Sequence, residues 1–171
     1  MYPIYQGTYG RGGNRHLPGT RDDRDQAIQQ SKEVRRSVDY LETRPEIDAT
    51  KLAYLGVCQG AAYGVIYTAL EDRFKTIVFL DGGFFLGPPL DGRDQVDFAP
   101  RTKKPVLMVN GRYDFTFSLD RAQLPLFRML GTPEAEKKHV VFDTPHDVSQ
   151  QKTELAKNVL GWLDKYLGRV N

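Results

Sequence analysis

Three residue types that together can carry out nucleophilic catalysis occur in this chain in an informative order. Cys58 lies in the pentapeptide GVCQG, a G-x-nucleophile-x-G pattern with cysteine in the position that serine usually takes. Asp114 follows in the segment GRYD, and His146 follows in DTPH. In such a set the thiol attacks a carbonyl group, the imidazole takes the thiol proton, and the carboxylate orients the imidazole. The order nucleophile, acid, histidine therefore predicts acyl-transfer chemistry.

Each of these residues follows a segment with the length and composition of a β-strand. The segments span residues 51–55, 105–110 and 138–142, and a fourth at 75–80 ends at Asp81. Helical patterns alternate with them, which predicts an α/β fold with a mostly parallel sheet of about four strands and flanking helices. Functional groups gather at the carboxyl ends of such strands, so the three placements support one another. Asp81 also ends a strand and is the competing candidate for the acid.

The residues around Cys58 provide the context that a sharp strand-to-helix turn requires. An apolar strand precedes the cysteine, and residues 61–70 are typical of a buried helix. The nucleophile of such a turn is strained, so nearby residues must be small to let strand and helix approach each other. Gly56, Gly60 and Ala61 meet that requirement. At a helix start we expect the helix dipole and an adjacent imidazolium to favour the thiolate of Cys58.

The remaining patterns complete a single domain over residues 1–171, with 1–21 as a loop or tail and 22–171 as the core. A polar helix is predicted over residues 22–42. Ser118 is expected to cap a further helix, kinked at Pro125. Residues 86–100 are rich in proline, glycine and aspartate and predict an irregular excursion. The last helix has the clearest apolar stripe, made by Leu155, Val159, Trp162, Leu163 and Tyr166.

These segments resemble the α/β-hydrolase superfamily, and specifically its dienelactone-hydrolase-like and prolyl-oligopeptidase-like branches. The resemblance rests on residues 47–61, on residues 104–114, and on His146 with the helix that follows it. It implies a short-chain carboxylic ester hydrolase that works through a covalent thioester. In that enzyme Cys58 would be the nucleophile, Asp114 the acid and His146 the base.

The resemblance also implies that the front of the family's sheet is absent, because only about fifty residues precede Cys58. The strand before the cysteine would then have an unpaired apolar edge, and we expect a homodimer or higher homo-oligomer that completes the sheet. The implied oxyanion hole joins the backbone N–H of Gln59 to an N–H from a loop of the absent part. The source of the second donor stays open, as does the alternative that the sequence is a fragment of a longer gene product.

Composition excludes several classes of protein. The formal net charge of +2 over 171 residues is too small to indicate a nucleic acid or an acidic membrane surface as partner. No apolar run has the length of a membrane span, and the N-terminus lacks the organisation of a secretory signal. The single cysteine cannot form an internal disulfide, and no Cys/His cluster has zinc-binding spacing. We expect a cytoplasmic protein with no metal or other cofactor and a small ester as its substrate.

Other interpretations of the same residues stay open. Cys58 could be a buried structural thiol, since free cysteine is among the most buried residue types. A hydrolase-like remnant that binds a partner is the alternative function, because cysteine replaces serine and the oxyanion loop is absent. His139 is expected to be structural, and His16 lies in a polar loop. Five aromatic residues near strand ends are candidates for an acyl pocket: Phe84, Phe85, Tyr113, Phe115 and Phe117.

Overall fold

The computed structural model describes residues 1–7, 9–12, 20–87 and 94–169. It divides the chain into two compact units, one made of residues 1–49 and 87–94 and the other of residues 50–86 and 95–171. The single domain expected over 1–171 stays a prediction. His16 lies outside the described residues.

The first unit contains the long helix α1, Arg21–Glu42, as the polar pattern predicts. Its buried positions recur at three- and four-residue spacing: Ala27, Ser31, Val34 and Val38. The N-terminal segment is tied to this helix through Glu33. Its carboxylate accepts the backbone N–H of Gln6 at 2.8 Å and pairs with Arg11 at 2.8 Å.

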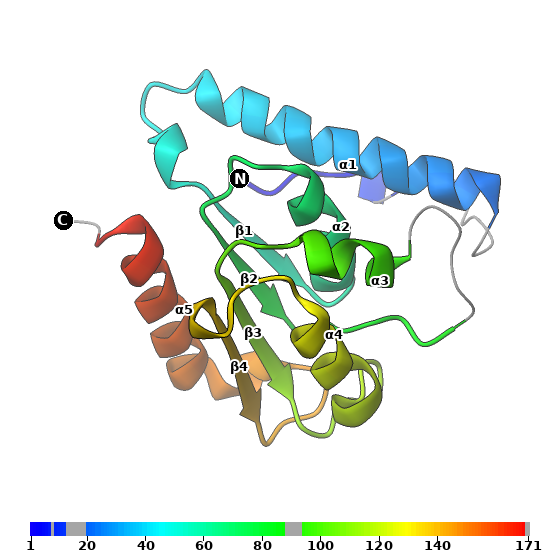
Figure 1. The fold of residues 1–171 in the computed structure, drawn as a ribbon. Coiled ribbons are helices and arrows are strands. Elements are labelled where there is room, and N and C mark those ends of the chain that lie inside the picture. Colours follow the sequence, from blue (N-terminus) through cyan, green and yellow to red (C-terminus); the bar gives the residue numbers. More distant parts are fainter. Residues whose placement is uncertain (8, 13–19, 88–93, 170–171) are drawn as a thin grey trace. The chain divides into compact units, whose positions relative to one another are not determined.

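The second unit is built on a four-stranded sheet with the order β1-β2-β3-β4, in which every neighbouring pair is parallel (Figure 1). The strands are β1 Ala53–Val57, β2 Thr76–Leu80, β3 Val106–Gly111 and β4 Lys137–Phe142. The parallel α/β sheet of about four strands is thereby confirmed. The first strand begins later than expected because Ala49–Lys51 forms a 3-10 turn.

Four helices accompany the sheet: α2 Gln59–Leu70, α3 Gln95–Phe98, α4 Leu124–Met129 and α5 Lys152–Leu167. Two expectations need correction. Part of the expected excursion at 86–100 is helical, since α3 and a 3-10 turn at Ala99–Arg101 lie in it. The helix expected from Ser118 begins instead as a π-type turn over Leu119–Gln123. Pro125 lies within the first two residues of α4, which follows this π-type turn directly.

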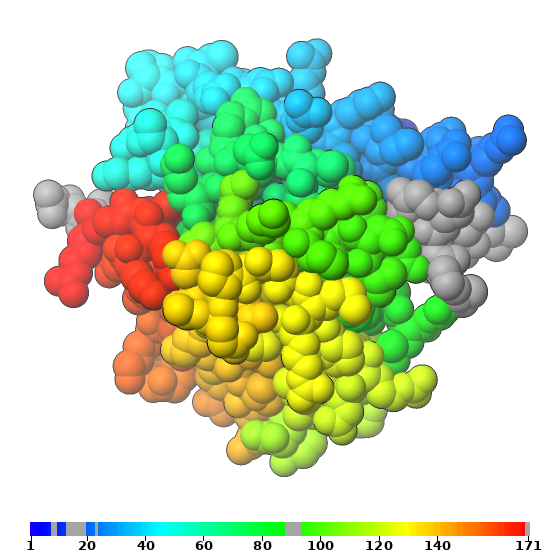
Figure 2. All heavy atoms as spheres, viewed as in Figure 1, coloured from blue at the N-terminus to red at the C-terminus, as the bar shows by residue number. Residues whose placement is uncertain are grey.

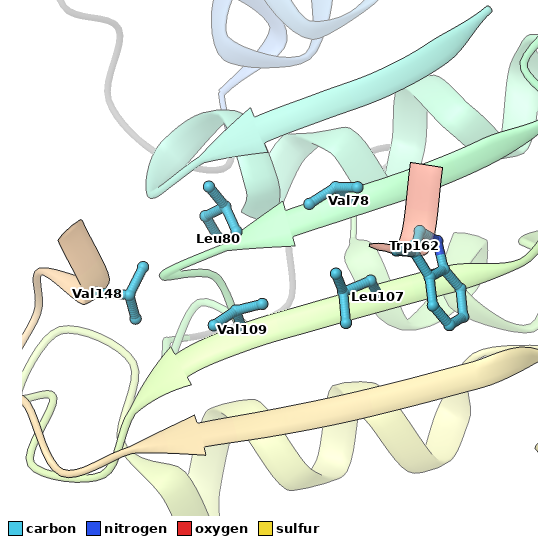
Figure 3. Packing of buried hydrophobic residues seen from close by; sticks show 6 residues of the cluster. All are labelled: Val78, Leu80, Leu107, Val109, Val148 and Trp162. Atoms are coloured by element: carbon cyan, nitrogen blue, oxygen red, sulfur yellow. The ribbon is translucent and has the colours of Figure 1, made fainter. Parts of the chain in front are cut away.

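The two faces of the sheet are covered by different helices. On one face the apolar stripe of α5 packs against side chains of β2 and β3, as the sequence pattern predicts. Figure 3 shows this cluster, in which Val148, from the segment after β4, packs with the strand residues. Its labelled members are Val78, Leu80, Leu107, Val109, Val148 and Trp162.

On the opposite face α2 lies close to β1 and β2. A side chain at Gly64 would collide with the rings of Tyr54 and Phe79, so this glycine permits the close contact. The ring of Phe127 in α4 lies 5.4 Å from that of His139 in β4. In the space-filling view the yellow segment around α4 covers part of the front of this unit (Figure 2).

Strand β1 forms one edge of the sheet. Among the described residues it pairs with β2 alone. Leu55 and Val57 are 50% and 53% exposed, although both belong to an apolar strand. The strand before Cys58 therefore has the unpaired edge that its position in the sequence predicts.

Candidate active site

The turn after β1 holds Cys58 in a strained backbone conformation at the start of α2. Its φ is 52°, in the left-handed region that residues with a side chain rarely adopt. Three backbone hydrogen bonds hold it there. Its N–H donates to the carbonyl of Leu80 at 2.8 Å, and its carbonyl accepts from Ala61 and Ala62 at 3.0 Å each. The strain projects the thiol from the end of the strand toward the carboxyl edge of the sheet.

The structure requires a small residue at position 56 but not at position 60. A side chain at Gly56 would collide with the carbonyl group of Gly60, and the hydroxyl of Tyr54 donates to that same carbonyl at 2.7 Å. A side chain at Gly60 would meet no atom within 4 Å. The expectation that Gly60 must be small is therefore wrong, because its Cβ position faces open space.

Asp114 lies in the turn after β3 with both carboxylate oxygens engaged. One oxygen accepts the backbone N–H groups of Thr116 at 2.7 Å and Phe117 at 3.0 Å. The other lies 2.8 Å from Nδ1 of His146. The residue is only 4% exposed, so the carboxylate is fixed by its surroundings rather than by solvent.

His146 lies between Asp114 and Cys58. Its Nδ1 faces the carboxylate at 2.8 Å, and its Nε2 lies 3.0 Å from Sγ of Cys58. An ionised carboxylate can only accept a hydrogen bond, so the Nδ1 of a neutral His146 carries the proton and Nε2 is free to accept one. Residues 58, 114 and 146 thus form one continuous hydrogen-bonded chain.

A close backbone approach places the histidine segment beside β3. The N–H of Tyr113 donates to the carbonyl of Thr144 at 3.0 Å. A side chain at Gly111 would collide with the carbonyl groups of Thr144 and Pro145. Glycine at position 111 is therefore a steric requirement for bringing His146 to Asp114.

The resting thiol is less acidic than the helix start suggests. Burial raises the pKa of Cys58, and the charges of Asp114 and Asp81 raise it further, whereas the backbone N–H of Gln59 lowers it. The expectation that the site favours a thiolate is wrong in direction. Two carboxylates brought in from other strands, together with desolvation, outweigh the helix start.

Asp81, the competing acid, is buried beside the same histidine but is not hydrogen-bonded to it. One of its oxygens accepts the backbone N–H of Val148 at 3.1 Å. Burial raises the pKa of Asp81. The charge of Asp114 raises this pKa further, whereas the hydrogen bond from the N–H of Val148 lowers it. One ligand atom each from Asp81, Asp114 and His146 lies within 4.8 Å of the others, so the fold assembles a possible cation-binding group that sequence spacing does not reveal.

An aromatic row extends from His146 beside the cysteine. The ring of Phe117 lies 6.0 Å from the imidazole, Phe85 lies 5.6 Å from Phe117, and Tyr63 lies 5.1 Å from Phe85. Cys58 packs against the cluster that contains Phe117. Sequence reasoning missed Tyr63, whose helix gave no functional signal.

Three of the five expected aromatic residues do not belong to this row. Phe84 is buried, and Tyr113 and Phe115 are 58% and 94% exposed.

Comparisons with known proteins place these features in context. The model of the dienelactone hydrolase family matches residues 4–140. A cold-adapted esterase from an Arctic intertidal metagenomic library has a similar structure, with a TM-score of 0.66 at 22% identity over 88% of this chain and 67% of that protein. A putative dienelactone hydrolase from Klebsiella pneumoniae gives 0.68 at 21% identity, over 82% of this chain and 62% of that one. An acylaminoacyl peptidase from Pyrococcus horikoshii gives 0.70 at 14% identity, over 86% and 29%.

Two further findings concern relatives and membranes. No curated protein gave a significant match. Among the described residues, none of the helices combines the length and apolar character needed to cross a membrane.

Proposed function

The chain belongs to the dienelactone hydrolase family, and from that premise we propose that it hydrolyses short-chain carboxylic esters with Cys58 as the nucleophile. The observation that carries the proposal is the continuous contact Cys58–His146–Asp114, with separations of 3.0 and 2.8 Å. The residues lie at the carboxyl ends of different strands of a fold that the esterase and peptidase structures share.

The proposed reaction begins with the thiol of Cys58 and an ester carbonyl. As Sγ bonds to the carbonyl carbon, Nε2 of His146 takes the thiol proton and the carbonyl oxygen becomes an oxyanion. The C–O bond to the alcohol then breaks while His146 gives its proton to the leaving oxygen. Water attacks the thioester with His146 as base, the C–S bond breaks, and the proton returns to the sulfur as the carboxylic acid leaves.

Two features of the site bear on the rate of this reaction. Because burial raises the pKa of Cys58, proton transfer to His146 accompanies the attack rather than preceding it. The backbone N–H of Gln59, which follows the nucleophile at the start of α2, is the proposed first donor to the oxyanion.

The aromatic row supports a small apolar acyl group as the preferred substrate part. Phe117 is fully buried, whereas Phe85 is 38% exposed, so the row has one accessible member beside a buried one. We expect Phe85→Ala to lower kcat/KM for p-nitrophenyl butyrate about tenfold more than for the acetate. Phe115→Ala is the matched control, since Phe115 is 94% exposed and lies outside the row. Equal effects of the two substitutions would exclude the row as the acyl site.

The nucleophile is tested by initial rates on p-nitrophenyl acetate for the wild type and Cys58→Ala. We expect saturable turnover that falls at least about 10³-fold in the variant. Because the chain has one cysteine, a mass increase of one acetyl group, removed by hydroxylamine, identifies the thioester at Cys58. Equal rates in both proteins would refute the proposal.

The alternative function is a hydrolase-like remnant that binds a partner, and the raised pKa of Cys58 favours it. Alkylation by iodoacetamide distinguishes the two. In a catalytic site His146→Ala slows alkylation at pH 7, because the imidazole takes the thiol proton. In a remnant with an ordinary buried thiol, the wild type and His146→Ala react equally slowly.

We also propose a homodimer in which the edge of β1 pairs with a second copy. The exposed Leu55 and Val57, on a strand that pairs with β2 on one side and has its other edge unpaired among the described residues, support this arrangement. In light scattering, Leu55→Lys should give monomers, and Leu160→Lys should not, because Leu160 lies on α5 at 59% exposure. A monodisperse wild-type monomer would contradict the proposal.

A further inference from the structure

Gln95, the first residue of α3, is a buried amide whose contacts reach two other parts of the chain. It is 4% exposed. Its amide nitrogen donates to the carbonyl of Ala62 at 2.8 Å and to the carbonyl of Gly83 at 3.1 Å. Its amide oxygen accepts the backbone N–H of Phe85 at 2.7 Å. Because breaking any of these bonds would leave a buried polar group unpaired, the amide holds all three backbone groups in place.

The contact with Ala62 reaches the turn that holds Cys58. The N–H of Ala62 donates to the carbonyl of Cys58 at 3.0 Å, while the carbonyl of Ala62 accepts from Gln95. The side chain of Cys58 also packs against the buried cluster of Ala62, Phe117 and Ala122. Gln95 is therefore connected to the backbone of the proposed nucleophile through a single residue of α2.

The other two contacts hold the segment that carries Phe85. The N–H of Phe84 donates to the carbonyl of Ala122 at 3.2 Å, and a Cβ at Gly83 would meet the Cβ of Ala122 at 3.0 Å. Residues 83 and 84 are thus packed closely, whereas Phe85 is 38% exposed. Packing alone does not fix a ring that is partly exposed, so the backbone bond to Gln95 contributes to the position of this ring.

We propose that Gln95 is a positioning residue that sets the acyl-chain selectivity of the site, because one amide joins the turn of Cys58 to the segment of Phe85. Gln95 acts through the ring of Phe85, which lies 5.6 Å from Phe117 in the aromatic row. The inference deepens the proposed function and rests on it. A displaced ring should disturb a butyryl group more than an acetyl group, because the longer chain has more apolar surface to place against the row.

The test compares Gln95→Met, Phe85→Ala and the double variant on p-nitrophenyl acetate and p-nitrophenyl butyrate. Methionine is similar in length to glutamine, but it cannot donate a hydrogen bond and accepts one only weakly. The readout is the ratio of kcat/KM for the butyrate to kcat/KM for the acetate, with the melting temperature measured alongside.

Thr132→Val is the matched control for the loss of a buried hydrogen-bonding group. The hydroxyl of Thr132, a residue that is 3% exposed, donates to the carbonyls of Thr102 and Lys104 at 3.1 and 2.7 Å. Both carbonyls precede β3, at the amino end of the strand and away from the candidate site. This substitution should therefore lower the melting temperature without changing the ratio.

We expect Gln95→Met to lower the ratio about fivefold and Thr132→Val to leave it unchanged. The double variant should have the same ratio as Phe85→Ala, because Gln95 acts on selectivity through that ring. A wild-type ratio in Gln95→Met, or a ratio in the double variant below that of Phe85→Ala, would overturn the inference. If Gln95→Met does not fold, Gln95→Asn takes its place in the cycle, since the shorter side chain cannot span the three backbone groups.

Failure of the proposed function gives a different result. If Cys58→Ala retains wild-type turnover on both esters, the thiol is not the nucleophile, and the inference about Gln95 fails with the function on which it rests. If Cys58→Ala loses turnover while Gln95→Met keeps the wild-type ratio, the proposed function stands and only the inference is refuted.

Discussion

Lowering the pH should destabilise this protein through His139, a residue outside the candidate active site. Its Nε2 lies 3.1 Å from Oδ1 of Asn110, whose amide nitrogen donates to the carbonyl of Gly82 at 2.8 Å. Burial lowers the pKa of His139 from 6.5 to about 4. The folded protein therefore keeps this imidazole neutral over a pH range in which the unfolded chain binds a proton.

The sign and size of the effect follow from these two values. A histidine whose pKa is lowered by folding contributes full stability above pH 6.5, and stability is lost as the pH falls toward 4. The loss is about 2 kcal/mol at pH 5 and about 3 kcal/mol at pH 4, as upper values for a partly buried group. That is a substantial part of the 5–15 kcal/mol that is typical of a small domain.

The assay is urea unfolding of the wild type and His139→Gln at pH 7, 6, 5 and 4. Glutamine keeps a donor for Asn110 but does not titrate. Taking the difference between the two proteins removes the contributions of other groups to the pH dependence of stability. Asp81 is one of them, and its raised pKa changes the stability with the opposite sign. We expect the wild type to lose about 3 kcal/mol more than the variant between pH 7 and pH 4. Parallel pH curves would refute the reasoning.

Four further outcomes follow from the packing and from the thiol. Gly56→Ala should lower the free energy of unfolding by about 1–3 kcal/mol, because the new Cβ would meet the carbonyl of Gly60. Gly60→Ala should change it by less than about 1 kcal/mol, and thermal denaturation measures both variants. Gln123→Leu should lower the free energy of unfolding, measured with urea, by at least about 2 kcal/mol, because the buried amide donates to the carbonyls of Gly111 and Phe117. A loss of less than half that value would contradict the structural role of this amide. Trp162→Phe should lower the free energy of unfolding by about 1 kcal/mol through loss of the hydrogen bond to Thr76. Trp162→Ala should lower it by about 3–5 kcal/mol, and denaturant titration followed by circular dichroism measures both variants. The rate of Cys58 alkylation should still be rising at pH 9, since the thiol pKa is raised above 9.0, and a plateau at neutral pH would show that a thiolate is present.

The elements of the sheet could be predicted because their signals are local. The strands at 76–80 and 106–111 are short, largely apolar runs bounded by polar, proline or glycine residues, and that pattern needs no tertiary information. The carboxyl ends of parallel strands meet at one edge, so Cys58, Asp114 and His146 could be proposed as neighbours before their distances were known.

The remaining features depend on contacts between distant parts of the chain. Helix α3 lies in a segment with turn-forming composition, and the amide of Gln95 anchors it by donating to the carbonyls of Ala62 and Gly83. The acidity of the thiol depends on Asp81 and Asp114, which approach from two other strands. The open space at Gly60 depends on which parts of the folded chain come near it. No periodicity or motif contains that information.

The sequential strand order has a consequence for biosynthesis. Because β1, β2, β3 and β4 are neighbours in the sheet in their chain order, each strand can join the growing edge as the ribosome releases it. Cys58 emerges with the first strand, and His146 follows 88 residues later. A nascent chain therefore displays the thiol before its base has been made. Under the proposed function, reactivity would appear only when the last strand and its loop have joined the sheet, so incomplete chains would carry the nucleophile in an inactive form.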